Sequence, residues 1–174
     1  VVMCGYGRVG QSIGRFLRSE HHAFVALDYD PERIQEAAKV ESCVHYGDAR
    51  RGDLLRAVGL DRARLLVIAV DDTDVAMCVL KEARLITIDV PILVRTRDDS
   101  LLVELKAAGA TEVVPELLES SLMLASHALI LLGIPERAVR HRVDEVRHNR
   151  YHLLDGCLEN ADARETPGFN REGE

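Results

Sequence analysis

Short apolar runs alternate with longer, mixed stretches along about two thirds of the chain. One run, Leu65 to Ala69, is apolar throughout, as expected for a parallel strand buried on both faces. The runs predict six strands, at residues 1–4, 23–28, 43–46, 65–69, 91–95 and 112–114. The intervening and following stretches predict helices at 9–20, 31–38, 52–57, 72–84, 98–108 and 115–132. This alternation predicts an α/β fold: a Rossmann-type, doubly wound parallel sheet of about six strands, followed by a crossover helix and a short helical tail.

A glycine-rich turn follows the first apolar run. The sequence Gly-Tyr-Gly-Arg-Val-Gly at 5–10 joins the first predicted strand to the first predicted helix. Gly5 permits a sharp turn, Gly7 lets a pyrophosphate approach the backbone, and Gly10 lets the helix pack closely on the strand. The N-terminus of that helix would offer free N–H groups and partial positive charge to a phosphate. This context predicts nucleotide binding rather than a purely structural turn.

The second predicted strand ends in an acid, Asp28, which lies 18 residues beyond Gly10. A carboxylate about 20 residues after the glycines is the group that holds the ribose hydroxyls in dinucleotide-binding folds. An acid at this position also disfavours NADP, because a 2′-phosphate would face a carboxylate. The alternative is that Asp28 is an ordinary loop or helix-capping acid.

The C-terminal third has a different character. The predicted helix 115–132 is apolar almost all round after its first turn, but Glu119, Ser126 and His127 interrupt it, whereas a membrane span needs about 20 clean apolar residues. We therefore expect a helix that is buried partly by another subunit, in a homodimer. The sequence predicts a nucleotide-binding domain at 1–133. It predicts a basic helix and a disordered C-terminal tail at 134–174.

Composition narrows the chemistry. The 174 residues carry a net charge of −7 and no Trp, which argues against a nucleic-acid partner. The four cysteines are widely spaced, so a zinc knuckle is not expected, and no metal site or catalytic residue is predicted. About 40 residues follow the predicted domain, too few for the substrate domain of a dehydrogenase. We expect a non-enzymatic protein, with a small NAD-dependent oxidoreductase as the alternative. Val1 already lies within a predicted strand, so we expect a piece of a longer protein.

Several motifs occur together in one order. They are Gly-Tyr-Gly-Arg-Val-Gly-Gln at 5–11, Leu-Asp-Tyr-Asp-Pro at 27–31, Tyr-Gly-Asp-Ala at 46–49, Asp71-Asp72, Arg-Thr-Arg-Asp at 95–98 and Val-Pro-Glu-Leu-Leu-Glu-Ser-Ser-Leu at 114–122. This set resembles the RCK domain, also called the KTN or Trk N-terminal domain. It is most similar to the cytoplasmic C-terminal domain of Kef-type monovalent cation:proton antiporters. The pattern at 146–150 departs from the glutathione-gated branch.

The resemblance implies a regulatory domain that binds AMP or NAD(H) and controls potassium transport by a transmembrane antiporter domain upstream, at the cytoplasmic face of the inner membrane. The domain of a potassium channel or a Trk-type uptake system is the alternative. The resemblance implies that Arg8 and Val9 lie at the phosphate turn, which is the glycine-rich turn at 5–10, and that Asp28 and Tyr29 lie at the ribose. It implies that Asp48 and Ala49 lie at the edge of the adenine and that Asp71 closes the site from the fourth strand. Arg95 either faces the ligand or a subunit interface, or is a solvated charge.

Overall fold

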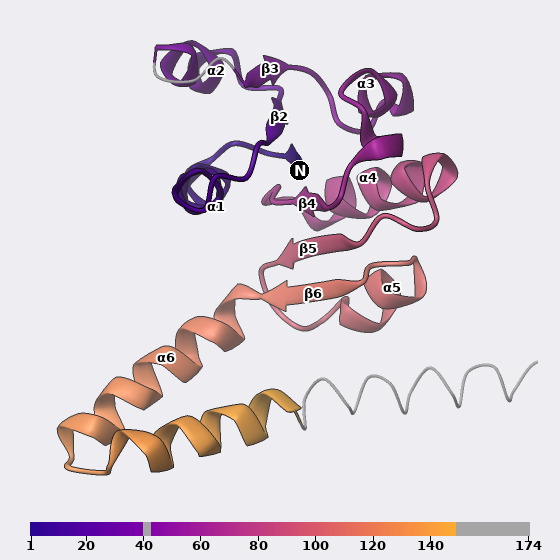
Figure 1. Cartoon of the computed structure of the whole chain (residues 1–174). Coiled ribbons are helices and arrows are strands. Elements are labelled where there is room, and N and C mark those ends of the chain that lie inside the picture. Colours follow the sequence, from indigo (N-terminus) through magenta and orange to yellow (C-terminus); the bar gives the residue numbers. More distant parts are fainter. Residues whose placement is uncertain (40–42, 149–174) are drawn as a thin grey trace, which may run out of the picture. The chain divides into compact units, whose positions relative to one another are not determined.

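The computed structural model describes residues 1–39 and 43–148 (Figure 1). Along the chain the elements are β1 (Val2–Cys4), α1 (Arg8–Ser19), β2 (Val25–Asp28), α2 (Pro31–Ala38), β3 (Val44–Tyr46), α3 (Gly52–Ala57), the 3₁₀ turn η1 (Leu60–Arg62), β4 (Leu66–Ile68), α4 (Thr73–Ile86), β5 (Ile92–Thr96), α5 (Leu102–Ala107), β6 (Glu112–Pro115) and α6 (Glu116–Leu131). Residues 136–148 form a further helix.

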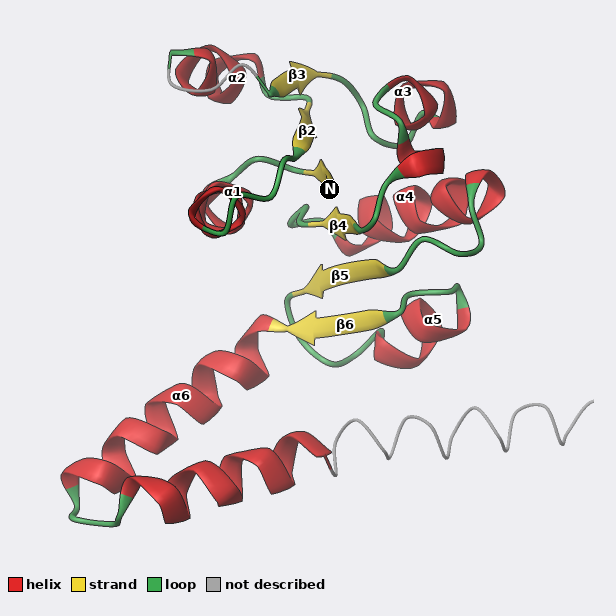
Figure 2. Cartoon of the chain, in the orientation of Figure 1, coloured by secondary structure: helices red, strands yellow, loops and turns green. Residues whose placement is uncertain are grey.

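The six strands form one sheet in the order β3-β2-β1-β4-β5-β6, and every pair of neighbours is parallel (Figure 2). In the view of Figure 1, α1 and α2 lie on one side of the strands, while α3, α4 and α5 lie on the other. The strand order reverses between β1 and β4, and ligands of open parallel sheets bind at the carboxyl ends of the strands beside such a point. The predicted fold class is confirmed.

The core lies around the central strands. All residues of β1 and β4 are buried, as their unbroken apolar sequences predict for strands covered on both faces. Tyr6 and Phe24 stack with ring centroids 6.1 Å apart, and they pack with Met3, Ala26 and Val67. Because β1 is fully enclosed, the turn that follows it has a fixed starting position.

Local hydrogen bonds explain where helices begin. Asp30 caps α2 by accepting from the N–H groups of Glu32 and Arg33, and Pro31 follows it at the first position of the helix. The helix predicted at 98–108 begins instead at Leu102. Asp98 accepts from the Ser100 N–H at 3.0 Å, and this local turn competes with the helix.

The chain divides into two compact units, Val1–Glu119 and Ser120–Glu174, with the boundary inside α6. The predicted basic helix is helical as far as residue 148, and the predicted disordered tail lies outside the described residues. Within residues 1–39 and 43–148, no helix combines the length and apolar character needed to cross a bilayer. Several large apolar side chains of α6 are exposed, namely Leu117, Met123, Leu124, Ile130 and Leu131.

Candidate nucleotide-binding site

The turn between β1 and α1 needs glycine at two positions. Gly5 has φ +93°, and a Cβ there would lie 3.0 Å from the backbone carbonyl carbon of Ala69. A Cβ on Gly10 would lie 2.3 Å from the carbonyl oxygen of Gly5, closer than any real contact. The first turn of α1 therefore packs directly on the strand end, which confirms the structural roles predicted for Gly5 and Gly10.

Gly7 stands at the N-cap of α1 and leaves its approach open. It supplies no side-chain cap, and the first turn of α1 contains no acidic residue. The nearest atom to a Cβ built on Gly7 is Nη1 of Arg33, at 3.6 Å, which is an ordinary contact distance. The N–H groups of Arg8 and Val9 belong to the first turn of α1, where helical carbonyl partners are lacking. The helix dipole adds partial positive charge, so this surface suits a phosphate.

Asp28 lies beside the turn, as predicted, but its carboxylate also supports the backbone. Oδ2 accepts from the Tyr6 N–H at 2.6 Å, and Oδ1 accepts from the Asp30 N–H at 2.9 Å. Asp28 is only 3% exposed. A carboxylate has about four lone-pair positions, so these bonds leave capacity for a ribose hydroxyl. Asp28 thus fixes the phosphate turn, and its contact with ribose stays a prediction.

Arg33 is a neighbour of the turn that sequence reasoning missed. Its Nε lies 3.0 Å from Oδ2 of Asp30 and its Nη1 lies 3.7 Å from Oδ2 of Asp28. The side chain is 43% exposed. A signal was present in the sequence: Arg33 stands in the first turn of the helix that follows Asp28, so it starts at the same edge of the sheet as the glycine turn.

Arg95 joins two acids at the ends of neighbouring elements. Nη1 of Arg95 donates to Asp71, which follows β4, and Nη2 donates to Oε2 of Glu116 at 2.6 Å. The hydrogen bond from Arg95 lowers the pKa of the Asp71 carboxyl, and the charges of Arg33 and Arg8 lower it further. The Arg95 side chain is 18% exposed, so it is not a solvated charge. Glu116, the first residue of α6, was not predicted as part of this edge.

The predicted adenine-edge residues follow β3. Asp48 accepts from the backbone N–H, Nε and Nη2 of Arg50, and the side-chain bond from Arg50 lowers the pKa of the Asp48 carboxyl. Ala49 is buried, and Tyr29 is largely exposed. The N–H of Gly47 donates to the Asp28 carbonyl at 2.9 Å, which ties the segment after β3 to the end of β2. The remaining predicted positions therefore lie along the same carboxyl edge.

An open apolar hollow lies along α2, where Ile34, Ala38 and Tyr46 are among its lining residues. It lies outside the glycine turn, because neither Gly7 nor any residue of α1 lines it. The geometry of the turn, with its open helix N-terminus, is the better indication of a ligand site.

Comparison with known proteins identifies the family. Residues 1–116, two thirds of the chain, match the model of the TrkA-N domain. The chain belongs to the TrkA-N domain family. The chain is 46% identical over 154 residues to the "Putative K(+) efflux antiporter KefB" of Alkalimonas amylolytica, covering 88% of this chain and 23% of that protein. It is 34% identical over 159 residues to the glutathione-regulated potassium-efflux system protein KefC of Cronobacter sakazakii, covering 91% and 26%.

Solved structures give the same relationship. The Kef CTD of Shewanella denitrificans, in its AMP-bound form, superposes with a TM-score of 0.77 at 31% identity, covering 88% of this chain and 93% of that one. The GsuK RCK domain gives a TM-score of 0.57 at 28% identity, covering 66% and 24%. The predicted resemblance to Kef-type RCK domains is confirmed. The chain spans about a quarter of the length of the curated relatives that it matches.

The residues present in the TrkA-N domain fit an adenine nucleotide. The open face of Gly7 and the first turn of α1 could hold a phosphate, and Arg8 adds positive charge there. Asp28 and Tyr29 could flank a ribose, and Asp48 and Ala49 the base. Among the described residues, no group of three or more His, Cys, Asp or Glu side chains is placed to hold a metal ion. A phosphate at this turn would meet N–H groups of α1 and the charge of Arg8.

Proposed function

We propose that this TrkA-N domain is the regulatory, adenine-nucleotide-binding domain of a potassium (monovalent cation):proton antiporter. The observation that carries the proposal is the open N-terminus of α1 at Gly7, which presents backbone N–H groups and has no acidic side chain in its first turn. The ligand is AMP or NAD(H). The named relatives, a K⁺ efflux antiporter and a potassium-efflux system, supply the transport context.

The proposal extends to the whole protein. A transmembrane antiporter domain precedes this chain, and the TrkA-N domain lies at the cytoplasmic face of the inner membrane. It acts by binding rather than by catalysis. A second candidate is the equivalent domain of a potassium channel, which the likeness to the GsuK RCK domain supports. The antiporter is favoured because the Kef CTD matches more of this chain with a higher TM-score.

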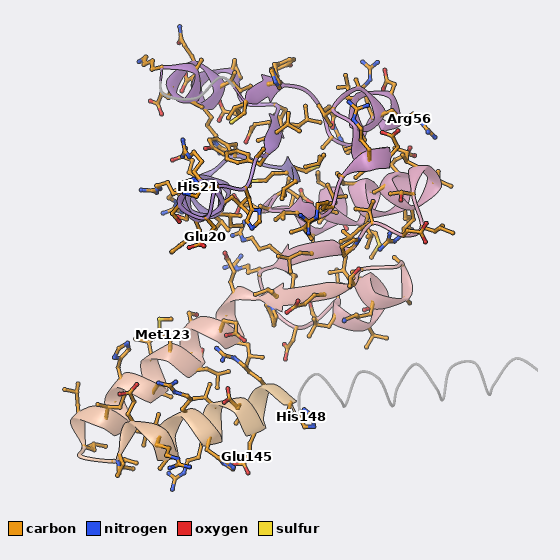
Figure 3. All side chains as sticks on the ribbon, viewed as in Figure 1. Glu20, His21, Arg56, Met123, Glu145 and His148 are labelled. Carbon is orange, nitrogen blue, oxygen red and sulfur yellow. The ribbon has the colours of Figure 1, made fainter. Side chains whose placement is uncertain are left out.

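The domain also acts as a homodimer in this proposal, through the helix at 115–132. The side chains of Leu117, Leu124 and Leu131 are largely exposed in the single chain. Met123 lies on the side of α6 away from the helix that follows it (Figure 3). Leu117, Leu124 and Leu131 are seven residues apart, which places them along one face of α6. Large exposed apolar patches mark interaction sites in soluble proteins. A second copy related by a two-fold axis would present the same helix and cover it.

Regulation requires that the nucleotide bind two conformations of the domain unequally. Arg95 supplies a physical route. It connects Asp71, at the carboxyl edge where the ligand is proposed to bind, with Glu116, where α6 begins. A phosphate that competes with Asp71 for Arg95 would also change the balance of the bond to Glu116. The start of α6, and with it the proposed dimer, would then respond to the ligand.

Substitution of Gly7 tests nucleotide binding. Gly7→Val places a branched side chain over the phosphate approach, and the fold should tolerate it because the nearest atom lies 3.6 Å from the new Cβ. We expect calorimetry to show micromolar AMP or NADH binding by the unaltered chain and none by the variant. Gly52→Val, in the first turn of α3, is a matched control, since its Cβ would meet only the flexible side-chain ends of Glu82 and Ile86. Equal AMP binding by both variants would contradict the site.

Cation-dependent proton flux tests the regulatory role. Full-length protein in vesicles should respond to AMP or NADH, and Gly7→Val should remove that response. Loss of nucleotide binding with an unchanged flux response would show that this domain is not the regulator.

A further inference from the structure

Arg33 reaches from α2 towards the phosphate turn of α1. Its backbone lies in the first turn of α2, and the Asp30 carboxylate that caps this helix accepts from its N–H. Its guanidinium turns back across the β2–α2 loop. Nη1 lies 3.6 Å and Cζ 3.9 Å from the position of a Cβ on Gly7, while Nη1 lies 3.7 Å from Oδ2 of Asp28. The cation therefore lies between the phosphate turn and the end of β2.

The surroundings of Arg33 leave it able to bind an anion. Its side chain is 43% exposed, so solvent and ligand can reach it. The acid nearest to Gly7, Asp28, already accepts from two backbone N–H groups and approaches Nη1 only at 3.7 Å, beyond hydrogen-bond distance. Asp30 contacts the Nε side of the guanidinium at 3.0 Å. The group that faces Gly7 is Nη1, which is the side that a phosphate at the N-terminus of α1 would meet.

We propose that Arg33 is a specificity-determining residue that donates hydrogen bonds to the 5′-phosphate of the bound adenine nucleotide. This inference rests on the proposed function and names a contact within the same site. Arg33 and the N–H groups of α1 would hold the phosphate from two directions. The domain thereby selects phosphorylated over unphosphorylated adenosine. A guanidinium suits this task because its planar N–H groups can engage two phosphate oxygens together.

A purely structural role for Arg33 makes a different prediction. If the side chain only neutralises Asp28 and Asp30, its removal should disturb the part of the site that holds the ribose. Adenosine and AMP should then lose affinity by the same factor. If Arg33 holds the phosphate, only ligands that carry the phosphate should lose affinity. Comparison of the two ligands therefore separates the two roles.

Calorimetric titration of AMP and adenosine into the chain and into Arg33→Gln tests the proposal. The variant should fold, because the Arg33 side chain is 43% exposed and the buried Asp28 carboxylate keeps its bonds from the Tyr6 and Asp30 N–H groups; circular dichroism checks this. We expect AMP to bind the variant roughly ten-fold to a hundred-fold more weakly, as for the loss of a charged hydrogen bond, with adenosine unchanged. Arg33→Lys should recover part of the loss. Arg140→Gln, which removes an exposed ion pair with Glu136 in the second unit, is the matched control.

The other outcomes are distinct. Unchanged AMP affinity in Arg33→Gln, or an equal loss for adenosine, would overturn the assignment of Arg33 while leaving nucleotide binding intact. A titration with 2′-AMP separates the two phosphate positions: weakening of 2′-AMP but not of 5′-AMP would move Arg33 to the ribose hydroxyls and overturn the 5′ assignment. If the unaltered chain binds neither AMP nor NADH, the proposed function itself fails, and the inference fails with it.

Discussion

Substitution of Asp28 should destabilise the domain as well as weaken ligand binding. The carboxylate is buried, and it accepts from the N–H groups of Tyr6 and Asp30 at 2.6 Å and 2.9 Å. Asp28→Ala removes both acceptors and leaves the Tyr6 donor without its carboxylate partner in a buried environment. A buried donor left unsatisfied costs about 1–3 kcal/mol, and the second, partly buried bond contributes about 1 kcal/mol. We therefore expect the free energy of unfolding to fall by roughly 2–4 kcal/mol.

Chemical denaturation followed by circular dichroism measures this loss. Asp53→Ala provides the control, because Asp53 is an exposed acid that pairs with Arg51 at 2.6 Å, and its removal should change stability far less. Ligand binding should then be measured under conditions where the Asp28→Ala domain remains folded. There we expect AMP affinity to fall by a further ~1–3 kcal/mol through loss of ribose hydrogen bonds.

Two results would refute the reasoning separately. If Asp28→Ala unfolds at the same denaturant concentration as the unaltered chain, the carboxylate does not hold the turn. If the folded variant binds AMP with unchanged affinity, Asp28 does not contact the ribose, and its role is confined to the backbone.

Gly10→Ala should lower stability by at least ~1–3 kcal/mol in thermal denaturation, because the new Cβ would lie 2.3 Å from the Gly5 carbonyl oxygen; an unchanged melting temperature would refute close packing of α1 on β1. Leu124→Glu should convert the proposed dimer to a monomer in sedimentation, whereas Leu85→Glu should not, although the two leucines are 71% and 75% exposed. NAD should bind more tightly than NADP, because the 2′-phosphate of NADP would face the carboxylates of Asp28 and Asp30 beside the expected ribose position. Equal affinities in a competition titration would contradict this.

The elements and the glycine turn could be predicted because their causes are local. Unbroken apolar sequence marks β1 and β4 as buried strands, and Asp30 caps α2 through N–H groups two and three residues further on. Gly10 contacts Gly5, five residues away, but both glycines belong to one motif, so the spacing of that motif predicts the contact. The predicted start of the helix at 98–108 was wrong, because Asp98 and Ser100 form a turn with hydrogen bonds of its own.

The side-chain contacts of the site could not be predicted in the same way, because they join residues far apart in sequence. Arg33 reaches Gly7 across the β2–α2 loop, and this depends on how α1 and α2 lie on the sheet. Arg95 and Glu116 meet because β5 and β6 pair with Arg95 opposite Val114. That register becomes known only once the sheet exists. The partner of Asp28 was missed for the same reason: its position beside the turn was predicted, but its bond to the Tyr6 N–H was not.

These long-range contacts share one property that bears on regulation. Tyr6 of the phosphate turn and Ala69 after β4 share one apolar cluster, and charged side chains add a second set of links between the turn, the ends of β2 and β4 and the start of α6. Three arginines from α1, α2 and β5 act on the single carboxylate of Asp71, which is largely exposed. An exposed carboxylate held by the Arg95 hydrogen bond and by nearby charge is a partner that an incoming phosphate could replace at little cost, since ion pairs at the surface are weak. A buried apolar contact in the same place would resist such replacement. In the proposed function, a ligand phosphate would redistribute these ion pairs, and the bond between Arg95 and Glu116 would bring that redistribution to the first residue of α6.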